Sequence, residues 1–319
     1  MRCGTCDAFP CKIGAKGDAE TRLIDPALMH GNVELHTGCR VRRLIADGEG
    51  KRIVAVEYER KGETLRVSAG MVVLSAGAIN SAALLLASAN ARNPNGLANS
   101  SGVVGLYFMN HNCTGLMAIS PRRTNTTRYP KTLTLNDYYF GGPGYAGNAG
   151  SDKPLGNLQL LGKIQEPMLR GVMPNAPKWS RRWLAQHSVD WYVMSEDLGQ
   201  AESRVQLRSD GSIVLDWKRS NLKAHRRWVD IARRLLKDLG FPVVLSKAFG
   251  ADSPSHQCGT VRFGDDPATL ALDTYCRAWD HDNLYVVDAS FFPSSAALNP
   301  ALTVAAQALR VGAHLKGRL

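Results

Sequence analysis

The sequence feature that most constrains the fold is a short apolar run, Met71–Leu74, which a glycine turn and a helix signal follow at once. A continuous run of this length is typical of a strand buried on both faces, as in a parallel sheet. Gly77 comes next, and Asn80 or Ser81 can cap a helix through residues 82–87. The segment therefore predicts half of a βαβ unit, either the sheet edge of a nucleotide-binding lobe or an ordinary α/β turn.

Strand-like runs lie on both sides of this unit. Residues 33–76 are predicted to be β structure beginning at Val33, with a hairpin across Lys61-Gly62. Residues 157–217 contain further strand-like runs, and Asp210-Gly211 is a strong hairpin turn between two of them. The middle of the chain is therefore predicted to be a separate lobe built on an antiparallel sheet.

Two helices are predicted in the second half of the chain. Residues 222–239 carry arginine and lysine on one face. The opposite, apolar stripe consists of Trp228, Ile231, Leu235 and Leu239. The last helix is expected to begin near Pro300, with Asn299 as its cap, and to end near Leu315.

The bulk composition describes a soluble globular protein. Of 319 residues, 44% are hydrophobic and 21% are charged, which is enough to bury a sizeable core. No apolar run is long enough for a membrane span. The net charge of +11 is spread over small clusters without a nucleic-acid-binding motif, so we expect solvated faces. A nucleic-acid-binding protein is an alternative that rests on charge alone.

The seven cysteines, an odd number in a long chain, argue against a disulfide scaffold and for a reducing, cytoplasmic compartment. Cys3, Cys6 and Cys11 form a C-x2-C-x4-C run, but a metal or iron–sulfur site needs a fourth ligand, which is not nearby in sequence. We therefore expect no metal and interpret the run as a turn-rich segment with packed or free thiols.

One motif is misleading. Residues 142–147 match G-x-G-x-x-G, which binds a dinucleotide only when it joins a buried strand to a helix. The next residues, 148–154, are Asn-Ala-Gly-Ser-Asp-Lys-Pro and cannot begin a long helix. The pattern predicts a glycine-rich loop.

The most informative region lies near the carboxyl end. His256 stands beside a Gly-Thr turn, residues 283–290 are predicted to be a strand ending in a polar turn, and Asn299-Pro300 opens the last helix. The amino end of that helix favours negative charge because its backbone N–H groups are unpaired. Taken singly, a histidine near a turn is more often structural, and a capped helix is more often a surface helix.

Together, the motifs of this region resemble those of the glucose–methanol–choline (GMC) oxidoreductase family. They are H-x-x-G-T-x-R from His256, N-L-Y-V-V-D-A-S-x-F-P from Asn283 and N-P-A-L-T from Asn299. Residues 73–81 are similar to the family's second signature, although Ala82 stands where a proline is usual. Residues 105–111 look like the family's link into its substrate lobe.

The resemblance implies an α/β (α+β) fold, in which a partial FAD-binding lobe with a mixed or parallel sheet accompanies a substrate lobe with an antiparallel sheet. The expected boundaries are 1–111 for the partial FAD-binding lobe, 112–250 for the substrate lobe, and 251–319 for the return segment with the active-site residues.

The resemblance also implies the site residues. His256 matches the family's active-site base, and Asn299 matches its second active-site position. FAD contacts are implied at Val41, Asp288, Ala289, Asn299, Pro300 and Ala301. An alcohol or sugar would lose its hydroxyl proton to His256 and a hydride to the flavin, while Asn299 positions the oxygen.

The family's amino-terminal strand–G-x-G-x-x-G–helix unit is not found at the start of this sequence. We therefore expect a carboxyl-terminal portion of a family member, with a missing amino-terminal FAD lobe as a possible partner. The alternative is a non-catalytic remnant or a partner subunit of a split enzyme.

Overall fold

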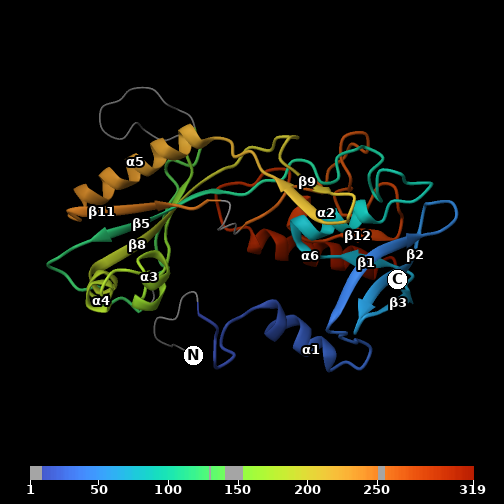
Figure 1. The fold of residues 1–319 in the computed structure, drawn as a ribbon, viewed down its shortest axis with the longest axis horizontal. Coiled ribbons are helices and arrows are strands. Elements are labelled where there is room, and N and C mark those ends of the chain that lie inside the picture. Colours follow the sequence, from blue (N-terminus) through green and yellow to red (C-terminus); the bar gives the residue numbers. More distant parts are fainter. Residues whose placement is uncertain (1–8, 129–130, 141–153, 251–255) are drawn as a thin grey trace. The chain divides into compact units, whose positions relative to one another are not determined.

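The computed structural model of the protein describes residues 9–128, 131–140, 154–250 and 256–319 (Figure 1). The chain divides into two compact units, which are described separately below. The first comprises Met1–Thr37, Cys113–Val193 and Arg226–Ala248, and the second comprises Gly38–Asn112, Met194–His225 and Phe249–Leu319. Residues 194–225 thus belong to the second unit, whereas the sequence-based boundaries place all of 112–250 in one lobe.

A five-stranded sheet, with the strand order β11-β5-β8-β7-β6, dominates the first unit. Its strands are β5 (Asn112–Ile119), β6 (Thr134–Leu135), β7 (Asn157–Leu160), β8 (Ser188–Ser195) and β11 (Val243–Ala248). β11 pairs with β5, and β6 with β7, in antiparallel fashion, as expected for the middle of the chain.

Helix α5 (Leu222–Asp238) confirms the amphipathic helix predicted over 222–239. The fully buried Trp228 donates from its indole Nε1 to the carbonyl of Asn157 on β7, at 3.1 Å. The predicted apolar stripe is wrong at its end, because Leu236 is buried whereas Leu239 is 65% exposed. The helix ends at Asp238, and Leu239 follows its last residue, although the N–H of Leu239 still donates to the carbonyl of Leu235 at 3.0 Å.

Four short helices also lie in the described part of the first unit. The π-helical turn η1 (Glu20–Ile24) and helix α1 (Asp25–Leu28) precede the sheet in sequence, and α3 (Glu166–Val172) and α4 (Lys178–His187) lie between β7 and β8. Residues 33–37 form no strand, contrary to prediction. They lie between Gly31 and Gly38, whose φ angles of +71° and +66° turn the chain at both ends.

Three antiparallel strands open the second unit, namely β1 (Cys39–Ala46), β2 (Ile53–Arg60) and β3 (Glu63–Ser68). The β2–β3 hairpin turns at Lys61-Gly62, as predicted. A second hairpin joins β9 (Arg204–Leu207) to β10 (Ile213–Asp216) across the predicted Asp210-Gly211 turn.

The apolar run at the start of the predicted βαβ half-unit is strand β4 (Val72–Leu74), and helix α2 (Gly77–Ala87) follows it. β4 pairs in parallel with β12 (Leu284–Val286), which lies about two-thirds of the chain away in sequence. The expectation of burial on both faces is wrong, because Val72 and Leu74 are buried while Val73 is 48% exposed.

The second unit ends with the 3-10 turn η2 (Ala289–Phe291) and helix α6 (Ala301–Lys316). Asn299 is not the cap of α6, contrary to prediction. Pro300 takes that position, with φ −86° and ψ −12°, because its ring holds φ near the helical value. Val311 is the buried residue of α6, whereas Leu302 and Leu309 are 83% and 73% exposed.

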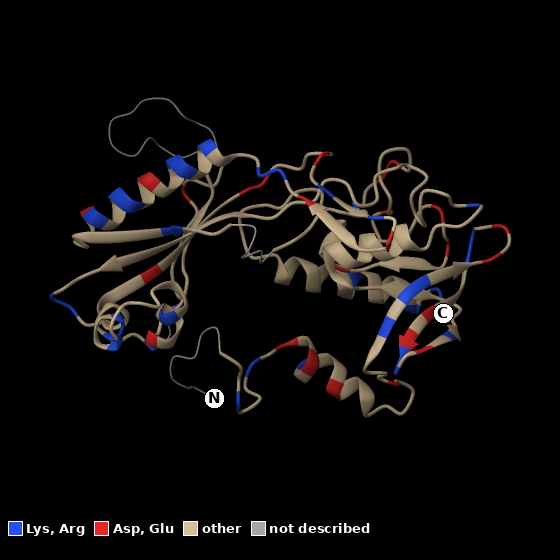
Figure 2. Cartoon of the chain, in the orientation of Figure 1, with Lys and Arg blue, Asp and Glu red and all other residues tan. Residues whose placement is uncertain are grey.

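Lys and Arg residues recur along α5 and β1, and α5 also contains acidic residues (Figure 2). Among the residues that the structure describes, none of the helices has the length and apolar character needed to cross a bilayer.

Two motifs discussed above fall outside the described ranges, wholly or in part. The glycine-rich segment 142–147 lies entirely outside them, as do Cys3 and Cys6. Within the ranges, no group of three or more histidine, cysteine, aspartate or glutamate side chains is arranged to hold a metal ion.

Candidate active site

His256 is held in place by the segment that precedes β5. Its backbone N–H donates to Oδ1 of Asn110 at 3.0 Å. Two residues later, Cys258 and Met109 exchange a pair of backbone hydrogen bonds, each 3.0 Å long. The H-x-x-G-T motif therefore lies directly against residues 109–111, although nearly 150 residues separate the two segments in sequence.

The glycine of this motif is required by its surroundings. Gly259 has φ +93°, and a β-carbon there would lie 2.5 Å from the carbonyl oxygen of Tyr107 and 2.5 Å from Cε of Met109. Its N–H donates to the carbonyl of Ala289 at 3.2 Å. The Gly-Thr turn thus joins the histidine to Ala289, three residues beyond the end of β12.

His111 is the neighbour of His256 that sequence reasoning did not single out. The two imidazole rings meet edge to face, with their centroids 4.7 Å apart and an interplanar angle of 69°. Nδ1 of His111 lies 3.1 Å from the carbonyl oxygen of Ala296. Because a carbonyl only accepts, Nδ1 carries the proton in this contact and Nε2 holds the lone pair.

Burial sets the protonation state of both histidines. It lowers the pKa of His111, which is 3% exposed, to about 4, and the neighbouring His256 adds to this effect. Burial also lowers the pKa of the half-buried His256. Both imidazoles are therefore neutral near pH 7. A neutral imidazole can accept a proton from a bound hydroxyl group.

One nitrogen of each imidazole lacks a hydrogen-bond partner among the residues that the structure describes. Nε2 of His111 and Nδ1 of His256 are buried, and neither has a hydrogen-bond partner within the described part of the chain. A buried nitrogen without a partner carries a free-energy cost that a ligand hydroxyl group can remove.

Asn299 lies three residues beyond Ala296, the residue that accepts from His111. The backbone of Leu298 also faces the His111 imidazole. His111 thus contacts both the ring of His256 and the segment leading to Asn299. The Asn299 side chain itself is exposed, as is Ala301, and Pro300 is half-buried.

Asp288 and Ala289 lie where β12 meets the glycine turn before α2. The Asp288 carboxylate, 7% exposed, accepts from the N–H of Gly77 at 3.0 Å and from the Ser81 hydroxyl at 2.5 Å. Its other oxygen accepts from the N–H of Ser290 at 2.7 Å. The carboxylate therefore links η2 to the glycine turn before α2.

Val41 stands apart from this group. It lies on β1 next to a bulge between Val41 and Arg43, and its side chain is 42% exposed. Among the hydrogen bonds and ring contacts of the described residues, none joins Val41 to the histidine pair.

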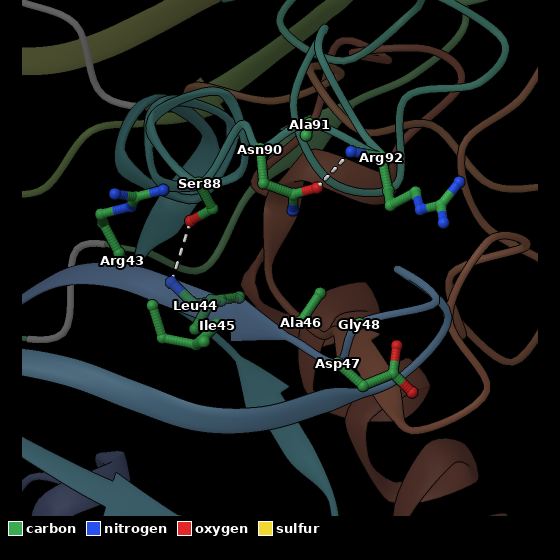
Figure 3. Close-up of a pocket in the computed structure, with 10 residues that line it drawn as sticks. All are labelled: Arg43, Leu44, Ile45, Ala46, Asp47, Gly48, Ser88, Asn90, Ala91 and Arg92. Carbon is green, nitrogen blue, oxygen red and sulfur yellow. Dashed lines mark hydrogen bonds between the residues drawn. The ribbon is translucent and has the colours of Figure 1, made fainter.

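A cavity of about 230 Å³ lies elsewhere in the second unit, between β1 and the residues that follow α2 (Figure 3). Ser88 closes one side by accepting from the N–H of Leu44 at 2.9 Å, and Arg43 donates to the carbonyl of Ala89 at 2.9 Å. Its lining contains no candidate site residue. It consists of Arg43, Leu44, Ile45, Ala46, Asp47, Gly48, Ser88, Asn90, Ala91 and Arg92.

Two family models, each described as GMC oxidoreductase, match residues 1–113 and 200–308. The first of these is the amino-terminal model of the family. The expectation that the chain is only a carboxyl-terminal portion is therefore not borne out, because residues 1–113 match the amino-terminal model.

Characterised proteins show the same relationship. Paromamine 6'-oxidase of Streptomyces fradiae is 31% identical over 98% of this chain and 58% of its own length. Gluconate 2-dehydrogenase flavoprotein of Pantoea cypripedii is 24% identical, over 95% of this chain and 54% of its own length. The chain thus spans a little over half the length of these relatives.

A solved structure supports the fold. Pyridoxine 4-oxidase from Mesorbium loti superposes with a TM-score of 0.64 at 20% identity, over 96% of this chain and 63% of that protein. The mixed α/β architecture described above is therefore shared with a known oxidase.

Proposed function

The chain belongs to the GMC oxidoreductase family, and on that premise we propose that it serves the oxidation of a CH–OH group in an alcohol or sugar, with FAD as the hydride acceptor. The names of its relatives support this class, since they include an oxidase of paromamine and a dehydrogenase of 2-methyl-1,2-propanediol. The observation that carries the proposal is the neutral imidazole pair formed by the buried His111 and the half-buried His256.

The residues present fit FAD. Gly77 has φ +82° and open space where a β-carbon would point, so a ligand can approach its backbone closely. The backbone of Asp288-Ala289 would lie near the diphosphate and ribityl chain, residues 299–301 near the isoalloxazine, and Val41 near the adenine. Bound FAD supplies the two-electron acceptor for the hydride.

The protein's own groups supply the proton chemistry and the geometry. His256 would accept the substrate hydroxyl proton, because its pKa lies below its ordinary value and the imidazole is free of a proton at one nitrogen. Asn299 would hold the substrate oxygen by an amide hydrogen bond while charge develops on it. These two residues remain the proposed catalytic pair.

The test compares His256→Ala with His36→Ala, a matched change at a histidine whose side chain is 53% exposed. Each FAD-loaded protein is mixed anaerobically with paromamine, gluconate, 2-methyl-1,2-propanediol, fructose or pyridoxine, and the loss of flavin absorbance is followed. We expect His256→Ala to slow flavin reduction by roughly 10²- to 10⁴-fold, while flavin content is unchanged. Reduction at the normal rate in His256→Ala would remove the residue from the mechanism.

A further inference from the structure

A buried carboxylate lies behind the histidine pair. Asp197 follows β8 and is 1% exposed. One carboxylate oxygen accepts from the N–H of Asn110 at 3.1 Å and from Nε1 of Trp217 at 2.8 Å. The other accepts from the N–H and the hydroxyl of Ser220, at 3.0 and 2.7 Å. Four donors thus compensate the burial of this side chain.

Asn110, whose N–H donates to Asp197, also contacts both histidines. Its side-chain oxygen accepts from the backbone N–H of His111 at 3.1 Å and from that of His256 at 3.0 Å. Asn110 is itself 3% exposed. One amide oxygen therefore fixes the backbones of two residues that are distant in sequence.

A second path runs from Asp197 to the ring of His111. The backbone N–H of Asp197 donates to the Ser295 hydroxyl at 3.0 Å, and that hydroxyl lies 3.0 Å from the Asp197 carbonyl. Ser295 precedes Ala296, whose carbonyl accepts from Nδ1 of His111. We call the closed set Asn110, His111, Asp197, Ser295 and Ala296 the Asp197 circuit.

The circuit holds His111 from both ends. Its backbone is fixed through Asn110 and its ring through Ala296, and the ring edge rests against His256. A ring fixed in this way limits the orientations that its aromatic neighbour can adopt. The same circuit carries residues 295–296, which lead to Asn299.

We propose that His111 is a positioning residue that, held by the Asp197 circuit, fixes the orientation of the His256 ring. Its effect on catalysis rests on the proposed function, whereas its effect on the His256 ring does not. His111 takes no proton from the substrate in this scheme, and its role is geometric. A displacement of a reacting group by about 1 Å can lower a rate by about 100-fold.

The test uses two substitutions at His111. His111→Leu removes the ring and the donor to Ala296 while keeping most of the volume. His111→Asn keeps an amide donor near the place of Nδ1. His225→Asn is the control, because His225 is another buried histidine of this unit, 4% exposed and bonded to the Ser195 hydroxyl at 3.0 Å.

The first readout is the NMR spectrum of ¹⁵N-labelled histidine side chains, which needs neither flavin nor substrate. We expect His111→Leu to shift or broaden the His256 imidazole signals, His111→Asn to do so less, and His225→Asn to leave them in place. Unchanged His256 signals in His111→Leu would overturn the proposal. If the leucine variant does not fold, the asparagine variant decides by the same comparison.

The second readout is flavin reduction by whichever alcohol of the panel above is active. We expect about a 100-fold lower kcat for His111→Leu with little change in KM, and a partial recovery in His111→Asn. If His256→Ala is slow but His111→Leu is normal in both readouts, this inference alone fails. If no alcohol of the panel reduces the flavin, the proposed function fails instead, and if His256→Ala reduces it normally, only the proposed role of His256 fails. In both cases the NMR comparison still tests the role of His111.

Discussion

At Gly259, the absence of a β-carbon allows two distant segments to approach each other. The carbonyl of Tyr107 and the methyl group of Met109 occupy the space that a side chain would need. Because Cys258 pairs with Met109, a shift of this turn would also move His256 relative to Asn110. The glycine of the motif is therefore a requirement of packing as well as of backbone conformation.

We expect Gly259→Ala to lower the free energy of unfolding by about 3 kcal/mol, since it adds a clash to a positive φ. Gly62→Ala is the matched control. Gly62 has φ +83° with nothing within 4 Å, so only the conformational strain of about 1 kcal/mol applies there. Urea denaturation measures both values. Equal losses in the two variants would contradict the packing argument.

The buried ionisable residues predict how stability depends on pH. Burial lowers the pKa values of His111 and His225 from 6.5 to about 4. Between these two pH values the imidazoles are therefore protonated in the unfolded chain but neutral in the native state. Their contribution to the stability of the native state is complete above the pKa of 6.5 in the unfolded chain, and it is lost as the pH falls toward 4. Asp190 acts in the opposite sense, because burial raises its pKa to about 6.

When the pH falls from about 7 to about 5, we expect each histidine to lower the free energy of unfolding by roughly 2 kcal/mol and Asp190 to raise it by roughly 1 kcal/mol. The protein should therefore be less stable at the lower pH. Urea denaturation at both pH values measures the difference, and His225→Gln should reduce it by about 2 kcal/mol. A difference that His225→Gln leaves unchanged would show that this imidazole is not held neutral in the native state.

At the scale of elements, α5 shows where helical periodicity stops being informative. Trp228 and Ile231 are buried as their spacing predicts. The same spacing selects Leu239, but the helix ends at Asp238 and Gly240 turns the chain with φ +92°. A hydrophobic residue just beyond a helix end therefore need not continue the buried face.

A pair of identical substitutions tests this assignment. We expect Leu236→Ala to lower the free energy of unfolding by about 3 kcal/mol, because it leaves a cavity at a fully buried position. Leu239→Ala should change it by less than about 0.5 kcal/mol, since that side chain is largely exposed. Chemical denaturation of the two variants compares them directly. Similar losses would place Leu239 in the core instead.

The parallel pair β4–β12 shows the opposite case, in which local sequence was sufficient. A short apolar run followed by a glycine turn predicted a parallel strand and a helix, and both are present. Its partner strand was also predicted as a strand, over 283–290. The exposure of Val73 was not predictable from the run, because it depends on which faces neighbouring elements cover.

At the scale of the whole molecule, the ordered motifs were enough to identify the family and its mixed α/β architecture. They were not enough to find the surroundings of His256. Asn110, His111 and Asp197 carry no local signature, and their importance arises from contacts across nearly 90 to 150 residues of chain. Residues 105–111 were noticed only as a link between lobes, although this link supplies the imidazole beside His256.

The division into two units separates the Asp197 circuit from residues 113–193. Every member of the Asp197 circuit belongs to the second unit, and the described residues of 113–193 contribute none of its hydrogen bonds. Substitution of residues 113–193, or their exchange between homologues, should therefore leave the hydrogen bonds around His256 unchanged.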